Sequence, residues 1–384
     1  MDFDLTDTQK ELKKNLIHWL KQESPGLITA TPGDLKAQQE VTRRFLQGLG
    51  RTDYYLQTGL DPGQTQNGPF SEALTWVFLA EELARVSPSL LVSIETSTRL
   101  FGWIISRYGK ARHLQEFLIP LQKGTLLGAL AMAESSRNFP EKEIKTLGQK
   151  EGDSFRVSGR KKQVINAPMA DCLAVTGKIN GHWAVFLIKS DQEGLSVGEP
   201  QKTLGLNDLA RADITLNHCL VPEDQVIGPF STPDFLAELQ TRSNLIVTIA
   251  SLGVMDRALS AAKKYAAESQ EGPKPLRAYQ TISFKLAEMF TLFQTSQWML
   301  YRTAWMLEAQ VAGAETMAAA TKVFVTEAAE SVAREAMQIM AGEGFLAGNV
   351  VEECYRDARF GPISGDTSEV LRLRIADDCL AKYR

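Results

Sequence analysis

Two carboxylates with helical spacing stand near the end of the chain, in the segment 360–370, which reads FGPISGDTSEV. Carboxylates are common general acids and bases, so the first question is whether Asp366 does chemistry or only helps to start a helix. Their D-x-x-E spacing ahead of an apolar, helix-like run is also the spacing of a capping box. The pattern therefore favours Asp366 first as a helix cap and second as a base.

Other residue types that do chemistry are isolated along the chain. The cysteines and histidines form no C-x-x-C and no metal-ligand spacing, so no zinc site, other metal site or disulfide framework is predicted. Gly342 and Gly344, in AGEGFLAGN, follow a helical pattern rather than a strand, which predicts a helix end and not a dinucleotide-binding loop. The isolated residues are Cys172, Cys219, Cys354, Cys379, His18, His113, His182 and His218.

Composition is that of an ordinary globular protein, with 384 residues, 44% of them hydrophobic and 23% charged. A net charge of -4 without long charged runs argues against nucleic-acid and anionic membrane partners. The first residues, MDFDLTDTQKELKKNLIHWLKQ, form an amphipathic helix pattern rather than a signal peptide. No stretch reads as the roughly 18 apolar residues of a membrane span, so we expect a cytoplasmic protein.

The periodicity of apolar residues changes twice along the chain. Residues 1–125 carry helical patterns, residues 126–232 carry short strand-like runs with turn signals, and residues 233–384 return to long helices. Asn180-Gly181 is a hairpin signal within the strand block. This order predicts three domains with these boundaries and excludes a doubly wound α/β sheet, in which strands and helices alternate.

Four segments resemble motifs of the acyl-CoA dehydrogenase family: EGDSFRVSGRKKQVIN at 151–166, YQTISFKLAEM at 279–289, AMQIMAGEGF at 336–345 and YRDARFGPISGDTSEVLRLRIA at 355–376. The similarity covers essentially the whole chain. It implies an α+β fold with an N-terminal helical domain, a middle β domain and a C-terminal four-helix bundle. It also implies FAD between the last two domains, and an acyl thioester of CoA or an acyl carrier protein as substrate.

In the family's reaction a carboxylate removes the α proton of the thioester while the β hydrogen leaves as hydride to the flavin. The motif I-Y-E-G-T-S-E falls on residues 363–369, which puts Gly365 at the position of the catalytic glutamate. Some members use an E-R pair nine residues before a leucine-glycine, and that pair falls on Ser243 and Asn244. Both base positions of the family therefore lack a carboxylate here.

The flavin contacts that the resemblance implies are also reduced. T-E-P-G-A-G-S-D becomes AESSRNFP at 133–140, W-I-T-N becomes QVIN at 163–166, and R-x-Q-F-G becomes SQEGP at 269–273. The losses include a threonine hydroxyl aimed at the flavin, now Ala133, and the tryptophan that packs on the ring, now Gln163. The cofactor-binding positions that remain are Asn166, Gln280, Gln338, Gly342 and Thr367.

Three functions are compatible with these losses. The favoured one is a subunit of a FAD-dependent oxidoreductase that introduces an α,β double bond, with FAD held mainly by a related partner chain, electrons leaving to an electron-transfer flavoprotein, and reduced or no activity alone. A self-sufficient homo-oligomeric dehydrogenase would need a relocated base, either Asp366 or Glu95, although Glu95 reads more simply as a helix-surface or helix-end carboxylate. The third is a non-redox protein that binds an acyl thioester.

Overall fold

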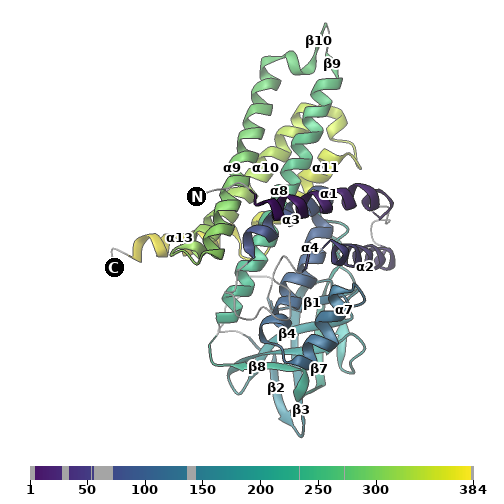
Figure 1. Cartoon of the computed structure of the whole chain (residues 1–384), viewed down its shortest axis with the longest axis vertical. Coiled ribbons are helices and arrows are strands. Elements are labelled where there is room, and N and C mark those ends of the chain that lie inside the picture. Colours follow the sequence, from purple (N-terminus) through teal and green to yellow (C-terminus); the bar gives the residue numbers. More distant parts are fainter. Residues whose placement is uncertain are drawn as a thin grey trace.

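The structure, a computed structural model, describes residues 5–27, 34–52, 54–55, 72–135, 144–232, 234–271 and 273–381. Helices, strands and again helices follow one another along the chain, which confirms the predicted α+β fold class. The sheet forms one end of the molecule, long helices form the other, and the N-terminal helices lie beside their junction (Figure 1). The domain boundaries at residues 125 and 232 stay predictions; they fall in connections between elements.

The N-terminal helices include one nearly continuous helical run, from Pro88 to Tyr108, that borders the site described below. Ser87 begins it by accepting a hydrogen bond from Leu90 N at 3.2 Å, and Pro88 occupies the first turn. The elements are α1 (Asp7–Leu27), α2 (Leu35–Arg51), α3 (Ala73–Val86), α4 (Pro88–Glu95), the π-helical η2 (Thr96–Gly102), α5 (Trp103–Tyr108), α6 (Ala111–His113), the π-helical η3 (Leu114–Leu118) and α7 (Ile119–Gln122).

The strands form one mostly antiparallel sheet in the order β6-β7-β3-β2-β4-β5-β8, with β1 parallel to β4. Asn180 and Gly181 join β4 to β5 with φ of 49° and 84°, so the predicted two-residue hairpin is confirmed. The strands are β1 (Gly128–Ala131), β2 (Leu147–Glu151), β3 (Ser154–Ile165), β4 (Cys172–Ile179), β5 (His182–Lys189), β6 (Leu195–Val197), β7 (Arg211–Pro222) and β8 (Val226–Phe230), with the 3₁₀ turn η5 (Glu223–Gln225) before β8.

An irregularity in the pairing of β3 with β7 shapes the end of β3. The register shifts between Lys161 and Val164, and Gln163 within this bulge has φ of 53°. Regular pairing resumes at Val164 with Ala212 and at Ile165 with Arg211. The bulge therefore redirects the last residues of β3 next to the first residue of β7.

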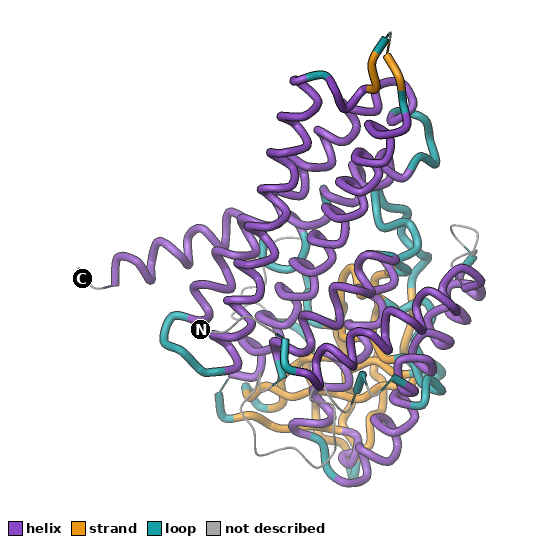
Figure 2. The backbone as a smooth tube through the Cα atoms, turned by 45° about the horizontal axis from the view of Figure 1, so that its top comes forward, coloured by secondary structure: helices purple, strands orange, loops and turns teal. Residues whose placement is uncertain are grey.

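Long helices build the C-terminal part. They are α8 (Asp234–Glu268), α9 (Gln280–Glu308) and α10 (Ala314–Gly344), followed by α11 (Val350–Ala358), α12 (Phe360–Ile363) and α13 (Ser368–Leu380). The short hairpin β9 (Gln270–Glu271) and β10 (Lys274–Pro275) and the 3₁₀ turn η6 (Leu276–Ala278) join α8 to α9. α13 projects from the body with the C-terminus at its far end (Figures 1 and 2).

Helix α8 is the central element of the larger apolar core, which also includes side chains of α3, α4, α9 and α10. It is the one described helix long and apolar enough to cross a membrane by composition, and 78% of its most apolar stretch is buried inside the protein. Such burial is the property of a core helix. Gly253 of α8 lies so close to α3 that an added Cβ would be 2.5 Å from Ala84 Cβ.

This close contact predicts the effect of adding one methyl group. We expect Gly253→Ala to lower the free energy of unfolding by about 1–3 kcal/mol, because α3 and α8 must separate. Gly342→Ala in α10 is the matched control, since its Cβ would meet nothing within 4 Å. Denaturant unfolding measures both variants, and equal stabilities would contradict the tight α3–α8 contact.

Candidate functional site

A cleft of about 280 Å³ lies where the N-terminal helices, the sheet and the C-terminal helices meet. Apolar side chains of α4, η2 and α8 form one part of its wall, and the end of β3, the start of β7 and the segment 360–367 form the rest. The lining residues are Val92, Thr96, Leu100, Leu130, Met132, Ala133, Ser135, Lys162, Gln163, Val164, Ile165, Arg211, Gln240, Ser243, Ile246, Val247, Phe360, Ile363, Ser364, Gly365, Asp366 and Thr367.

Gly365 lies on this wall in a conformation that favours glycine. Its φ is 64°, in the left-handed region that side chains with a Cβ rarely adopt. A Cβ at this position would lie 2.7 Å from Asn244 Oδ1 and 3.3 Å from Lys322 Nζ. The space into which a side chain at 365 would begin is therefore already occupied.

Lys322 of α10 holds residues 364–366 in place. Its side chain is buried, and Nζ donates to Asn244 Oδ1 at 3.0 Å and to the backbone carbonyls of Ser364 and Asp366. Burial lowers the pKa of the Lys322 amine to about 7, although the Asp366 carboxylate opposes this shift. Three acceptors for one ammonium group make the lysine a clamp on residues 364–366.

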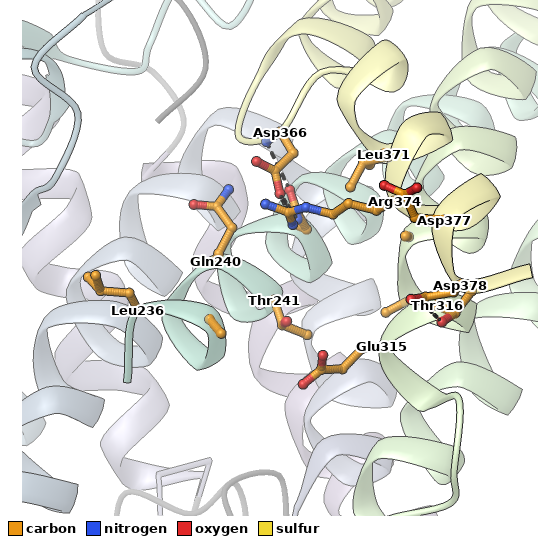
Figure 3. Close-up of a pocket in the computed structure, with 14 residues that line it drawn as sticks. Leu236, Gln240, Thr241, Glu315, Thr316, Asp366, Leu371, Arg374, Asp377 and Asp378 are labelled. Carbon is orange, nitrogen blue, oxygen red and sulfur yellow. Dashed lines mark hydrogen bonds and ion pairs between the residues drawn. The ribbon is translucent and has the colours of Figure 1, made fainter. Parts of the chain in front are cut away.

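Asp366 is bound on its other side by an arginine. Its Oδ2 accepts hydrogen bonds from Arg374 Nη1 at 2.8 Å and from Asn244 Nδ2 at 3.0 Å. The Asp366 and Arg374 side chains point toward each other at the edge of a second cavity of about 440 Å³, which shares Gln240 and Asp366 with the cleft (Figure 3).

The interpretation of Asp366 as a helix cap is wrong. Thr367 is the N-cap residue of α13, and no side chain caps this helix end. The carboxylate of Asp366 instead forms an ion pair with Arg374, about two turns along α13, because residue 366 precedes the cap and its side chain turns inward. Among the described residues lining the cleft, Asp366 is the one carboxylate, and two donors hold it.

Glu95 is neither on the surface nor at the cleft, so its interpretation as a helix-surface carboxylate is also wrong, whereas the helix-end interpretation is confirmed because Glu95 is the last residue of α4. It is 0% exposed, and it accepts hydrogen bonds from the Tyr54 hydroxyl, Trp76 Nε1 and Thr98 Oγ1. Arg99 Nε lies 3.4 Å from its Oε2. Burial raises the pKa of Glu95, and the surrounding donors oppose that shift. This carboxylate is a structural element of the N-terminal core.

Two of the predicted cofactor residues lie near the cleft, in different roles. Thr367 lines it directly. Asn166 is fully buried, where its amide donates to the carbonyls of Ser93 and Gly128 and its Oδ1 accepts from the Ser93 hydroxyl. With φ of 67° and every side-chain polar atom engaged, Asn166 joins the sheet to α4.

The other three predicted cofactor residues are remote from this cleft. Gln280 begins α9, and Gln338 and Gly342 lie near the end of α10; all three are exposed. They lie toward the end of the bundle that carries the β9–β10 hairpin (Figure 1). From Ser243 to the end of α8 near that hairpin, 25 residues of helix span roughly 37 Å. The structure therefore does not bring the two groups together.

Sequence reasoning missed Lys322, Arg374 and Arg211 as parts of the site. Lys322 had a detectable signal, because it is a single charge within the apolar run AAATKVFV. No sequence signal marked Arg211 or Arg374, since an arginine at the start of a strand or on a short helix is ordinary. Of the segment 133–140, residues 136–140 lie outside the described residues.

The buried lysine leads to a prediction about stability and pH. Lys322→Met should lower the free energy of unfolding by about 3 kcal/mol, because three acceptors lose their donor. The folded-state pKa is about 7 and the ordinary value 10.5, so the unfolded chain binds more protons between them and stability rises with pH across this window. Denaturant unfolding from pH 7 to 10 should show that this rise is smaller in the variant.

The exposed Lys264 of α8 supplies the control, Lys264→Met. Its unfolding free energy should follow that of the unmodified chain at each pH. Parallel curves for all three proteins would contradict the placement of Lys322 in a buried clamp.

Comparison with known proteins was made on sequence and on structure. Benzylmalonyl-CoA dehydrogenase of Aromatoleum aromaticum is 26% identical, over 98% of this chain and 99% of that protein. The mitochondrial short-chain specific acyl-CoA dehydrogenase of Homo sapiens is 29% identical, over 85% of this chain and 80% of that one. The structure of butyryl-CoA dehydrogenase from Megasphaera elsdenii has the same fold, with a TM-score of 0.85, 24% identity and coverage of 99% and 100%.

Two family models match this chain. The model "Acyl-CoA dehydrogenase, middle domain" matches residues 129–219, and "Acyl-CoA dehydrogenase, C-terminal domain" matches residues 241–380. Together they cover more than half of the chain, across the β part and the helical part that enclose the cleft. The chain belongs to the acyl-CoA dehydrogenase family.

Proposed function

We propose that this chain is a subunit of a FAD-dependent acyl-thioester dehydrogenase and that it does not itself supply the base. The observation that carries the proposal is the space beside Gly365. A missing glutamate alone could be family variation, but here Asn244 and Lys322 fill the place where its side chain would start. In this chain, hydrogen bonds from Lys322 to Asn244 and to the backbone of residues 364 and 366 hold the loop.

Removal of the α proton needs a carboxylate within hydrogen-bond reach of the substrate. Ser243, at the second position used by the family, faces the cleft with a hydroxyl, which is too weak a base without a neighbour that activates it. Asp366 is held by Arg374 and Asn244, and Glu95 is enclosed in the N-terminal core. The relocated-base alternatives therefore gain no support from the geometry.

FAD is the cofactor of this family, and when bound it accepts the β hydrogen of the thioester as hydride. The fit of the residues present is partial. Arg211 brings a buried Nε without a hydrogen-bond partner among the described residues, and Lys162 and Thr367 add donors on the same cleft wall. Ala133 and Ile165 offer no hydroxyl. Arg211, Lys162 and Thr367 are the donors that would hold FAD here. Val92, Leu100 and Ile246 would pack on the acyl chain.

The partner in this proposal is a related dehydrogenase chain. Gln280, Gln338 and Gly342 are exposed and remote from this chain's cleft, so they can contact a cofactor only in a neighbouring chain. Such a partner would supply the carboxylate, and an electron-transfer flavoprotein would remove the electrons. The names of several relatives support CoA as the thioester carrier, including benzylmalonyl-CoA dehydrogenase and the short-chain specific acyl-CoA dehydrogenases.

The proposal is tested by producing the full chain alone and together with a homologous dehydrogenase chain. Butyryl-CoA with an artificial electron acceptor is the probe, and flavin per chain is measured from the visible spectrum. Activity should appear with the co-produced chain and be absent or much lower alone. A homo-oligomer that is fully loaded with flavin and active by itself would overturn the proposal.

Asp366 can be tested separately from the partner. We expect Asp366→Asn to leave the turnover of the assembled enzyme within about twofold, because the amide oxygen still accepts from Arg374 and no base is lost. Asp366→Ala should keep this rate but lower the free energy of unfolding, since Arg374 and Asn244 lose an acceptor. A 100-fold slower Asp366→Asn enzyme would show that Asp366 is the base.

The family's two base positions, residues 243 and 365 here, give opposite predictions when each is replaced by glutamate. Ser243→Glu points into the cleft and should accelerate exchange of the α proton of butyryl-CoA in D₂O by about 100-fold, as positioned bases do. Gly365→Glu should give no gain and a less stable protein, because its Cβ meets Asn244 and its backbone is left-handed. Mass spectrometry of the recovered thioester measures the exchange. Rapid exchange by Gly365→Glu would contradict the account of a filled base site.

A further inference from the structure

Arg211 lies in the cleft, and none of the site features described above requires an arginine there. It is the first residue of β7, and it pairs across the strands with Ile165, next to the β3 bulge. It lines the cleft, and its Nε is buried with no hydrogen-bond partner among the residues that the structure describes. Burial lowers the pKa of this guanidinium, which nevertheless stays charged at neutral pH.

The Arg211 side chain as a whole is only partly buried, so the rest of its guanidinium can meet a ligand acceptor when the cleft is occupied. The protein itself does not provide one in the described structure. Of the charged residues on the described cleft wall, Lys162 and Arg211 are cations, and Asp366 is the one carboxylate. Asp366 is already neutralised by Arg374 at 2.8 Å. The cleft near Arg211 is therefore electropositive and suits an electron-rich ligand atom.

The position of Arg211 also restricts which ligand atom it can meet. It lines the same small cleft as the apolar residues Val92 and Leu100, on which the proposed function places the acyl chain. Hydride transfer requires the flavin ring to lie against the acyl chain, so the ring and not the pyrophosphate enters this space. Val164 and Ile165, beside Arg211, are apolar and provide no side-chain hydrogen bond to the ring.

We propose that Arg211 donates a hydrogen bond to a ring oxygen of FAD bound in this chain's own cleft. The arginine thereby replaces donors that the motif segments no longer carry at Ala133 and Ile165. The positive charge stabilises the electron-rich reduced ring, so it also raises the reduction potential of the flavin. This goes beyond the proposed function, because it places a flavin in a chain that lacks the base.

The test uses the full chain, alone and with its co-produced homologue, and titrates FAD into the apoprotein. Arg211→Met should weaken FAD binding by about 10- to 100-fold, the effect of losing a charged hydrogen-bond donor. It should also lower the midpoint potential of the bound flavin. Arg211→Lys, which keeps the charge but not the planar donor, should show an intermediate potential and also serves if the methionine variant is unstable. Thermal unfolding followed by circular dichroism checks that each variant is folded.

Arg156→Met is the matched control, because Arg156 lies on β3 in an exposed pair with Glu151. It should change neither FAD affinity nor potential. Weaker binding without a change in potential would assign Arg211 to the pyrophosphate and overturn the ring assignment. Unchanged binding in Arg211→Met, or absence of FAD from the unmodified chain in both preparations, would overturn the proposal. These outcomes do not depend on whether the chain turns over acyl-CoA alone.

Discussion

The rest of the site depends on the hydrogen bonds that the Lys322 side chain donates. Its ammonium group lies inside the bundle, where an ion is costly unless its donors are satisfied, and it finds acceptors in Asn244 and in the backbone of residues 364–366. The same acceptors fix the path of the loop on the cleft wall. Gly365 adopts a left-handed conformation beside them, and Asp366 is turned toward Arg374. These residues form one mutually dependent network.

The core of the fold is separate from this network. The core around α8 is built from apolar side chains and from close contacts such as Gly253 against Ala84, and none of these involves residue 365. Packing and catalysis are specified by different residues, so one can be kept while the other changes. At residue 365, by contrast, an added Cβ would lie 2.7 Å from Asn244 Oδ1 and 3.3 Å from Lys322 Nζ.

The sequence predicted the fold well because fold class depends on periodicity and turn chemistry, which are local properties. The Asn180-Gly181 hairpin and the order of helical and strand blocks are examples. It predicted the site less well because contacts such as Lys322 with Ser364 join residues 42 positions apart. The capping interpretation of Asp366 failed for the same reason, since local spacing could not show that Asn244 and Arg374 would bind its carboxylate.

The charges on the cleft wall are a second reason to expect an electron-rich ligand in the cleft and no general base on its wall. Under the proposed function, position 365 supplies no base. The Lys322 amine, whose pKa is lowered to about 7, lies 3.3 Å from where a Cβ at 365 would be. When this amine is charged, it lowers the pKa of a nearby carboxylate and makes that carboxylate a weaker base. Arg211 and Lys162 add positive charge to the wall of the same cleft. The charge distribution therefore supports both proposals, the absence of a base at residue 365 and an electron-rich ligand beside Arg211, as two consequences of the same excess of cations.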